Sequence, residues 1–394
     1  MSDMRSGTTD TSRPADERAD LWDKHIGRKV RFAEEWLFGG RRASYGLAVV
    51  RIVFGLTALG FLAANWLNRH YLWGDASRWL ELIDDNGDFG WPFTMFHGGS
   101  GTVELDLKLG LVAAVLVLLV IGWRTRFIAP MALVLWVSLI ESQPIYGDQS
   151  DNIFRIVLFY MCFADISGRW SLDARRRAKQ AAGEWRSPIR LPIWPELREN
   201  GSKVATLLHN MAVLAIAGQV FIIYVASAMY KIQGSAWQDG TGIYYPLQVD
   251  LYAPWPALSD MLTMSALGVL VATYFSVFIQ LFFPLLLLRR TTRVLALLSV
   301  SAMHVGIAVF MGLPFFSLFI MAADAIFIRD STYEGLQRWV RGTWKNRSQG
   351  RKAGGAENPV GPSTDNRRAT SIVPADGVRE VVGAARGDGP RSTA

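Results

Sequence analysis

Eight apolar segments run through this chain of 394 residues and limit the folds that are open to it. A helix that crosses the hydrocarbon layer of a membrane needs about 20 mainly apolar residues. The third, fourth and eighth segments are shorter than this, so we expect them to be tilted, re-entrant or thinly inserted. The pattern predicts an all-α protein, a polytopic transmembrane helix bundle of about eight spans. The segments are 47–66, 107–123, 128–140, 153–166, 204–229, 264–288, 294–311 and 315–328.

The basic residues predict how these spans are oriented, because cytoplasmic loops are enriched in Lys and Arg. If the N-terminus is cytoplasmic, the inward segments hold 35 of the 41 Lys and Arg residues. The outward loops then hold only Arg69, Arg78 and Lys231. With one span fewer, every later loop would lie on the opposite side of the membrane, and Lys and Arg would no longer be concentrated on one side. We therefore predict a multi-pass protein of the plasma membrane with both termini in the cytoplasm.

Three parts of the chain differ in composition. Residues 1–44 are expected to form a cytoplasmic N-terminal segment, with no cleavable signal peptide. Residues 45–330 are expected to form the transmembrane domain. Residues 331–394 are expected to form a disordered basic cytoplasmic tail, because the sequence from 345 onward is rich in Gly, Arg, Pro and Ser.

Composition also excludes several classes of function. The net charge of +7 is accounted for by the inward loops, so we predict no nucleic-acid partner. The single cysteine, Cys162, excludes a disulfide framework and a cysteine-based zinc site. The acidic cluster at 84–88 lacks the spacing and the closing Glu of a calcium loop. It is interpreted as part of a solvated loop with Trp anchors, and no metal site is predicted.

The outer loop over 141–152 contains three carboxylates and precedes a basic residue at the start of the fourth span. Asp151 and Arg155 are four residues apart and would lie on one face of a helix. This spacing favours a structural ion pair between them. The alternative is a substrate-binding group that consists of Asp148, Asp151 and Arg155.

Lys231 is the cation that most clearly departs from the charge pattern, because the fifth span delivers it to the outer surface. One interpretation is that its amine reaches the outer lipid phosphates. The other is that Lys231 is a partly desolvated amine that acts as a catalytic base. Trp237, Asp239 and Tyr244 follow it and are candidate substrate-binding residues.

Two ionisable residues lie inside later spans. His304 is in the seventh span, near its outer end, and Asp324 is in the eighth. Groups of this kind are costly in a membrane and suggest function, although a neutral His that is hydrogen-bonded between helices is also common. Asp324 is a candidate partner for Arg51 in the first span.

At these residues the sequence resembles a known family. The string over 230–240, Tyr-Lys-Ile-Gln-Gly-Ser-Ala-Trp-Gln-Asp-Gly, is similar to a motif of the horizontally transferred transmembrane domain family. That family includes the membrane half of vitamin K-dependent gamma-carboxylase. Arg51, the stretch 165–173, and His304 with the following Gly312 and Phe315 match in the same order, so the resemblance covers residues of about 45–330.

Within this superfamily, longer stretches resemble membrane proteins of the sporulation-delaying protein B type, which are needed to mature a secreted peptide toxin in bacteria. These stretches are 121–127, 219–224 and 237–245. The carboxylase resemblance implies a catalytic Lys that deprotonates a reduced quinone, a role that would fall to Lys231 with His304 in support. The His that the carboxylases carry before the fourth span is replaced here by Ser150-Asp151-Asn152, and their large docking domain has no counterpart.

Three functions are therefore expected, in order of preference. The first is assistance in the maturation or export of a secreted antimicrobial peptide or toxin. Its partners would be membrane lipid, the peptide precursor and a small soluble accessory protein. The second is a quinone-dependent, carboxylase-like membrane enzyme with Lys231 as its base and a reduced quinone as its cofactor. The third is a carrier for a lipid or a small molecule.

Overall fold

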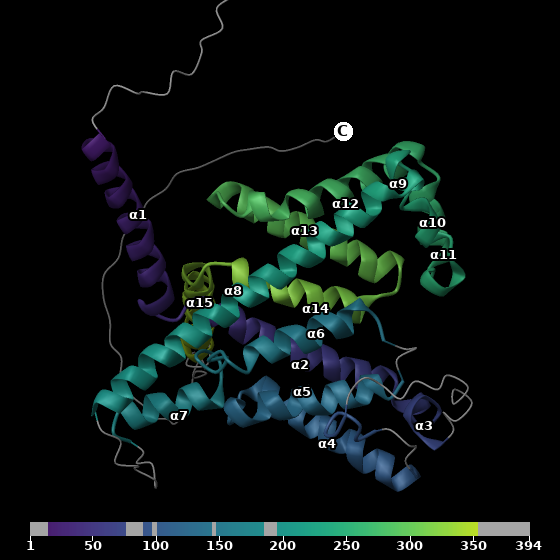
Figure 1. The fold of residues 1–394 in the computed structure, drawn as a ribbon. Helices are drawn as coiled ribbons and strands as arrows, with labels where there is room; N and C mark the ends of the chain where they lie inside the picture. Colours follow the sequence, from purple (N-terminus) through teal and green to yellow (C-terminus); the bar gives the residue numbers. More distant parts are fainter. Residues whose placement is uncertain (1–14, 76–89, 97–100, 144–146, 185–194, 354–394) are drawn as a thin grey trace, which may run out of the picture. The chain divides into compact units, whose positions relative to one another are not determined.

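The computed structural model describes residues 15–75, 90–96, 101–143, 147–184 and 195–353, and these residues form helices and no strand (Figure 1). The chain divides into two units, residues 1–338 and 339–394. The first unit contains the helix bundle. The described part of the second is the C-terminal portion of helix α15 (Asp330–Ala353). Helix α15 overlaps the N-terminal part of the tail over 331–394, for which the sequence predicts disorder.

Each of the eight apolar segments coincides with a helix, so the predicted helical segments are confirmed. The helices are α2 (Ser44–Ala64), α4 (Thr102–Ile121), α5 (Thr125–Glu141), α6 (Gln149–Met161), α8 (Pro195–Gln233), α12 (Ala266–Leu286), α13 (Arg290–Phe310), and α14 (Pro314–Asp324) with the short continuation Ala325–Phe327. Helix α6 ends five residues before the predicted limit, and the chain after it leaves the helix.

Four of these helices are long and apolar enough to cross a membrane: α2, α8 from Asn200, α12 and α13. The stretch Pro314–Phe327 is a shorter apolar helix. Helix α4 carries Glu104, Asp106 and Lys108 in its first two turns. The described residues thus support a membrane protein, and the count of eight spans stays a prediction.

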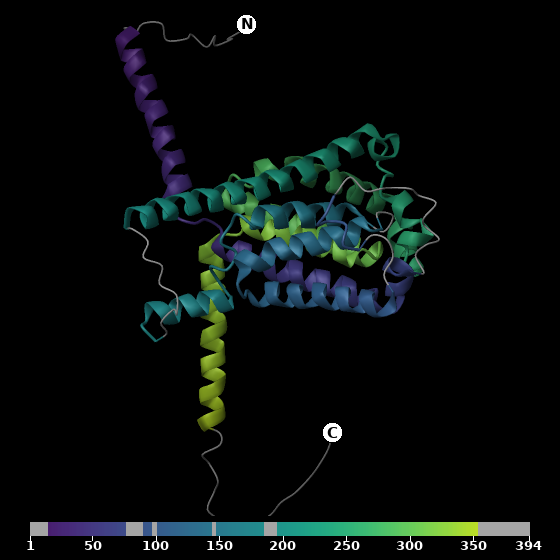
Figure 2. The same ribbon diagram turned by 60° about the horizontal axis from the view of Figure 1, so that its bottom comes forward.

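The bundle has two ends, which Figure 2 shows clearly. One end carries α3 (Arg69–Trp73), α9 (Ser235–Gln238), α10 (Tyr244–Leu247) and α11 (Pro256–Thr263), and we call it the Lys231 end. The other carries α7 (Leu172–Ala181), and we call it the arginine end. Successive long helices run between the two ends in alternating directions.

Helices α2, α5, α6 and α14 meet in an aromatic core. Phe54 stacks on Phe154 with ring centroids 5.2 Å apart and meets Phe319 edge-on at 5.3 Å. Trp136 contacts Phe154 at 4.9 Å. Each such aromatic pair contributes about 0.5–1.5 kcal/mol beyond the area that it buries. This core holds the helices that carry the pocket between α5 and α6.

Arg51 on α2 is fully buried, and the predicted pairing with Asp324 is wrong. Its guanidinium instead donates to backbone carbonyls, at 3.1 Å to Ile166, 2.6 Å to Leu119 and 2.8 Å to Trp170, and also to Val120. The carbonyls of the last turn of a helix are free acceptors with partial negative charge. The end of α4 therefore supplies the compensation that a carboxylate was expected to supply.

The turn between α4 and α5 is built around this arginine. Gly122 ends α4 with a φ of +70°, and a Cβ there would lie 2.9 Å from the Arg51 guanidinium. Asp173 on α7 accepts hydrogen bonds from the backbone amides of Arg124 and Thr125, at 3.1 and 3.0 Å, and so caps α5. The glycine gives both the left-handed backbone and the space that this junction requires.

The N-terminal segment predicted over 1–44 contains a helix in its described part, α1 (Ala15–Phe38). Asn210 on α8 holds the chain that follows α1 by donating to the carbonyls of Leu37 and Gly40, each at 2.8 Å. Its side chain oxygen accepts from the backbone amide of Arg42 at 3.0 Å. The entry into α2 is thereby held against α8.

Candidate functional site

Lys231 lies near the C-terminal end of α8, where the chain turns sharply into α9. Its amine donates to the side chain oxygen of Gln280 on α12 at 2.6 Å. The same amine is 5.2 Å from the ring centroid of Trp237, which the turn folds back over it. A Cβ at Gly242 would collide with that indole ring, so the glycine allows the close approach. The amine is therefore held by one amide and one aromatic face.

A pocket of about 550 Å³ lies beside Lys231, and its wall is otherwise almost wholly apolar. Its lining comes from α10, α12, α13 and α14 as well as α8. The lining residues are Lys231, Trp237, Ile243, Pro246, Leu247, Leu262, Ala272, Phe275, Ser276, Ala302, Met303, Gly306, Ile307, Phe310, Met311, Leu313 and Phe316. Ligand pockets commonly combine apolar walls with a few polar groups that fix orientation. This one fits a ligand with an apolar body and an oxygen acceptor, and we call it the Lys231 pocket.

A buried polar cluster lies next to the Lys231 pocket. Tyr224, two helical turns before Lys231 on α8, donates its hydroxyl to Asp324 at 2.7 Å. The same hydroxyl is 3.4 Å from Nε2 of His304. The His304 ring lies 5.9 Å from the ring of Phe316, which lines the pocket. Nδ1 of His304 and Oδ1 of Asp324 have no hydrogen-bond partner in the described part of the chain.

Of the two predicted catalytic residues, only Lys231 reaches the pocket. Lys231 lines the pocket, whereas His304 lies behind its wall and hydrogen-bonds to Tyr224. Gln280 and Tyr224 hold the two residues and were missed as site residues. Each is a polar side chain inside an apolar helix, which is the signal that pointed to His304.

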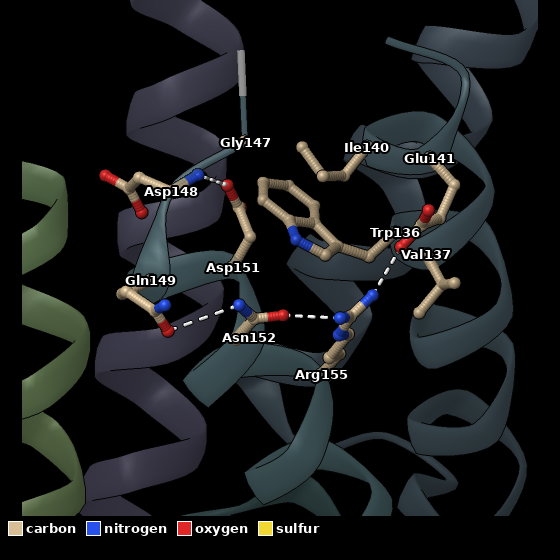
Figure 3. Close-up of a pocket in the computed structure, with 10 residues that line it drawn as sticks. All are labelled: Trp136, Val137, Ile140, Glu141, Gly147, Asp148, Gln149, Asp151, Asn152 and Arg155. Atoms are coloured by element: carbon tan, nitrogen blue, oxygen red, sulfur yellow. Dashed lines mark hydrogen bonds and ion pairs between the residues drawn. The ribbon is translucent and has the colours of Figure 1, made fainter. Parts of the chain in front are cut away.

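A second pocket, of about 390 Å³, lies between the end of α5 and the start of α6 (Figure 3). Three of the predicted substrate-binding residues line it: Asp148, Asp151 and Arg155. Arg155 forms its ion pair with Glu141 on α5 and donates to Asn152, so the predicted pair with Asp151 does not form.

The carboxylate of Asp151 has another role. It accepts from the backbone amide of Asp148 at 3.0 Å, while Asp148 accepts from the backbone amide of Ser150 at 2.6 Å. Together they form a capping box at the start of α6. Because capping occupies both carboxylates, Arg155 reaches across to Glu141 on the neighbouring helix.

The other three predicted substrate-binding residues, Trp237, Asp239 and Tyr244, do not line one common pocket. Trp237 lines the Lys231 pocket. Asp239 is exposed after α9, and Tyr244 is 43% exposed with its ring against that of Tyr245. The described residues hold no group of three or more His, Cys, Asp or Glu side chains that could bind a metal ion.

Comparison with known proteins gives one informative match. The chain is 27% identical over 144 residues to sporulation-delaying protein SdpB of Bacillus subtilis (strain 168). The match covers 36% of this chain and 38% of that protein, so the chain spans well under half of the curated relative's length. No family model matches the chain. No solved structure shows significant similarity to it.

Proposed function

We propose that this chain is an integral membrane protein of the sporulation-delaying protein B type that assists the maturation or export of a secreted peptide. The Lys231 pocket carries the proposal. An apolar peptide segment would bury its side chains against the pocket wall, gaining about 25 cal/mol for each Å² removed from water. Lys231 would donate to a carbonyl or carboxylate oxygen of that segment, in an orientation that Gln280 fixes.

The surroundings of Lys231 favour a binding role over a purely structural one. An amine needs hydrogen-bond acceptors, and burial without them is costly. Among the residues that the structure describes, Lys231 has one such acceptor, Gln280, and a favourable position over the Trp237 ring. Two of its three donors are therefore available to a ligand in the pocket.

The proposal includes an orientation, with eight spans, both termini in the cytoplasm and the Lys231 end outside the cell. The alternating directions of the long helices and the Arg residues at the arginine end support it. A topology reporter fused after Gly99 should report the outside, and one fused after Lys179 the inside. The reverse result would place Lys231 in the cytoplasm and exclude a role with secreted peptide outside.

The function is tested by deleting the gene and following the small secreted precursor that we expect to be encoded beside it. Mass spectrometry of the culture medium should show the mature peptide with the wild-type protein and unprocessed or no peptide without it. Lys231→Met should behave like the deletion, because it keeps the length of the side chain and removes the donors. Lys179→Met, on exposed α7, is the matched control and should process normally. Mature, active peptide in the deletion strain would refute the role.

A second function, a quinone-dependent enzyme, is favoured by one observation. An amine held beside an aromatic ring in an apolar pocket of about 550 Å³ suits a flat ring with an apolar tail. In this role Lys231 would act as the neutral amine, and its Nζ would accept the proton from the hydroxyl of a reduced quinone. The protein in nanodiscs, given a reduced naphthoquinone, oxygen and bicarbonate, should then oxidise the quinol. A rate equal to that of Lys231→Met would exclude this role and leave peptide maturation untouched.

A further inference from the structure

A third cavity lies at the arginine end of the bundle, far along the helices from Lys231. It has a volume of about 830 Å³ and is lined by residues of α5, α6, α7 and α8 and of the segments that join them. Five of its residues are arginines: Arg41, Arg124, Arg126, Arg176 and Arg177. Two carboxylates, Asp165 and Asp173, line the same cavity, so the arginines exceed them by three charges.

Asp165 is already committed to two of these arginines. It pairs with Arg41, and its carboxylate is 3.6 Å from Arg177. It also accepts from the hydroxyl of Ser167 at 2.9 Å. Asp165 is therefore already paired with two of the cavity's arginines.

Asp173 is committed as well. One function is the cap on α5, where it accepts from the backbone amides of Arg124 and Thr125. The other is an ion pair with Arg176 at 3.3 Å. The side chains of Arg124 and Arg126 have no ion-pair partner among the described residues, and Arg124 lies 5.5 Å from the ring of Trp123. Two guanidinium groups two residues apart thus face the cavity without a counter-charge.

The same cavity has an apolar wall. Phe127 is 68% exposed, Phe163 48% and Leu208 44%, and all three line it beside the arginines. A soluble anion would use only the charged part of such a site. A molecule that has both a phosphate and acyl chains would use the charged part and the apolar wall together.

We propose that this cavity binds one anionic phospholipid, with its phosphate on Arg124 and Arg126 and its acyl chains against Phe127 and Phe163. Guanidinium groups bind phosphate oxygens through paired, charge-assisted hydrogen bonds. The lipid supplies the negative charge that the two committed carboxylates cannot. The site is separate from the Lys231 pocket and does not depend on the peptide role.

Native mass spectrometry of the purified protein, titrated with phosphatidylglycerol in detergent, tests the proposal. The double variant Arg124→Gln/Arg126→Gln should bind the lipid about 30-fold more weakly, since each cation contributes about 1 kcal/mol to binding an anionic lipid. Phosphatidylcholine should bind weakly to wild type and variant alike. The matched control is Arg289→Gln/Arg290→Gln, which removes the same charge from exposed positions outside the cavity and should bind normally.

Other outcomes overturn the proposal. An equal loss in the control would mean diffuse attraction to basic loops rather than a site. Displacement of the lipid by millimolar inorganic phosphate or glycerol 3-phosphate would mean a site for a soluble phosphate. If the double variant fails to fold, Arg126→Gln alone and the charge-keeping Arg124→Lys/Arg126→Lys pair replace it. Binding should fall about 5-fold in the first, which loses one charge. It should fall less in the second, which keeps both charges and loses only the paired hydrogen bonds, and wild-type binding in the first would also refute the site.

Discussion

Arg51 and Lys231 are both cations on apolar helices, yet the protein surrounds them in opposite ways. Arg51 is fully buried and donates to four backbone carbonyls from two separate segments. Lys231 is half-buried, donates to one side chain amide and borders a pocket. The nitrogens of the Arg51 guanidinium are all hydrogen-bonded within the protein, whereas the amine of Lys231 keeps donors that a ligand can use. A cation inside a span thus indicates structure or function according to how many fixed acceptors it has.

The largest expected effect is that of Arg51→Met on stability. The substitution leaves four carbonyls, two of them fully buried, without this donor. Removal of one partner from a buried charged network costs about 3–5 kcal/mol. Thermal unfolding of the purified protein in detergent should show a much lower midpoint. A midpoint equal to that of wild type would mean that water replaces the guanidinium and that Arg51 is not structural.

A smaller loss is expected for Tyr224→Phe. The change removes the hydroxyl from Asp324 and leaves a buried carboxyl with neither oxygen hydrogen-bonded, which costs about 1–3 kcal/mol. The same unfolding measurement tests it. In an Asp324→Leu background the loss should nearly vanish, because the unsatisfied carboxyl is gone. An equal loss in both backgrounds would mean that the hydroxyl acts through another group.

The smallest effect on stability is expected for Lys231→Met, a loss of about 1 kcal/mol or less. The amine gives up a single hydrogen bond, and a Met side chain suits the apolar wall of the pocket. The loss should appear in peptide processing instead. If Lys231→Met unfolds as easily as Arg51→Met, then Lys231 is a structural residue like Arg51.

Much of the fold could be predicted from the sequence, because an apolar helix can be recognised from the residues of its own segment. All eight apolar segments coincide with helices, although α6 ends five residues before the fourth segment does and α8 begins nine residues before the fifth. The acidic cluster over 84–88 in the first outer loop lies outside the described residues. The positions of the termini relative to the membrane stay predictions.

Less of the candidate site could be predicted, because it depends on which residues meet across helices. Every residue has a backbone carbonyl, so a sequence does not show which carbonyls bind Arg51. It does show the ionisable residues, and it therefore suggested Asp324 as the partner. Spacing favoured Asp151 for Arg155, but the capping box occupied that carboxylate. Lys231 was found because its charge breaks the pattern of its loop. Its partner Gln280 is 49 residues away, and nothing local connects the two.

The carbonyls that hold Arg51 also set an order for assembly. They belong to residues between 68 and 119 positions further along the chain. When α2 leaves the ribosome, its arginine therefore has none of its final acceptors and must stay near the membrane surface, where water solvates it. It can enter its site only after α4, α6 and the chain as far as Trp170, just before α7, have been made. The first apolar helix to be synthesised, α2, is thus among the last to reach its final position, and a nascent chain that stops before Trp170 lacks one acceptor of the Arg51 charge.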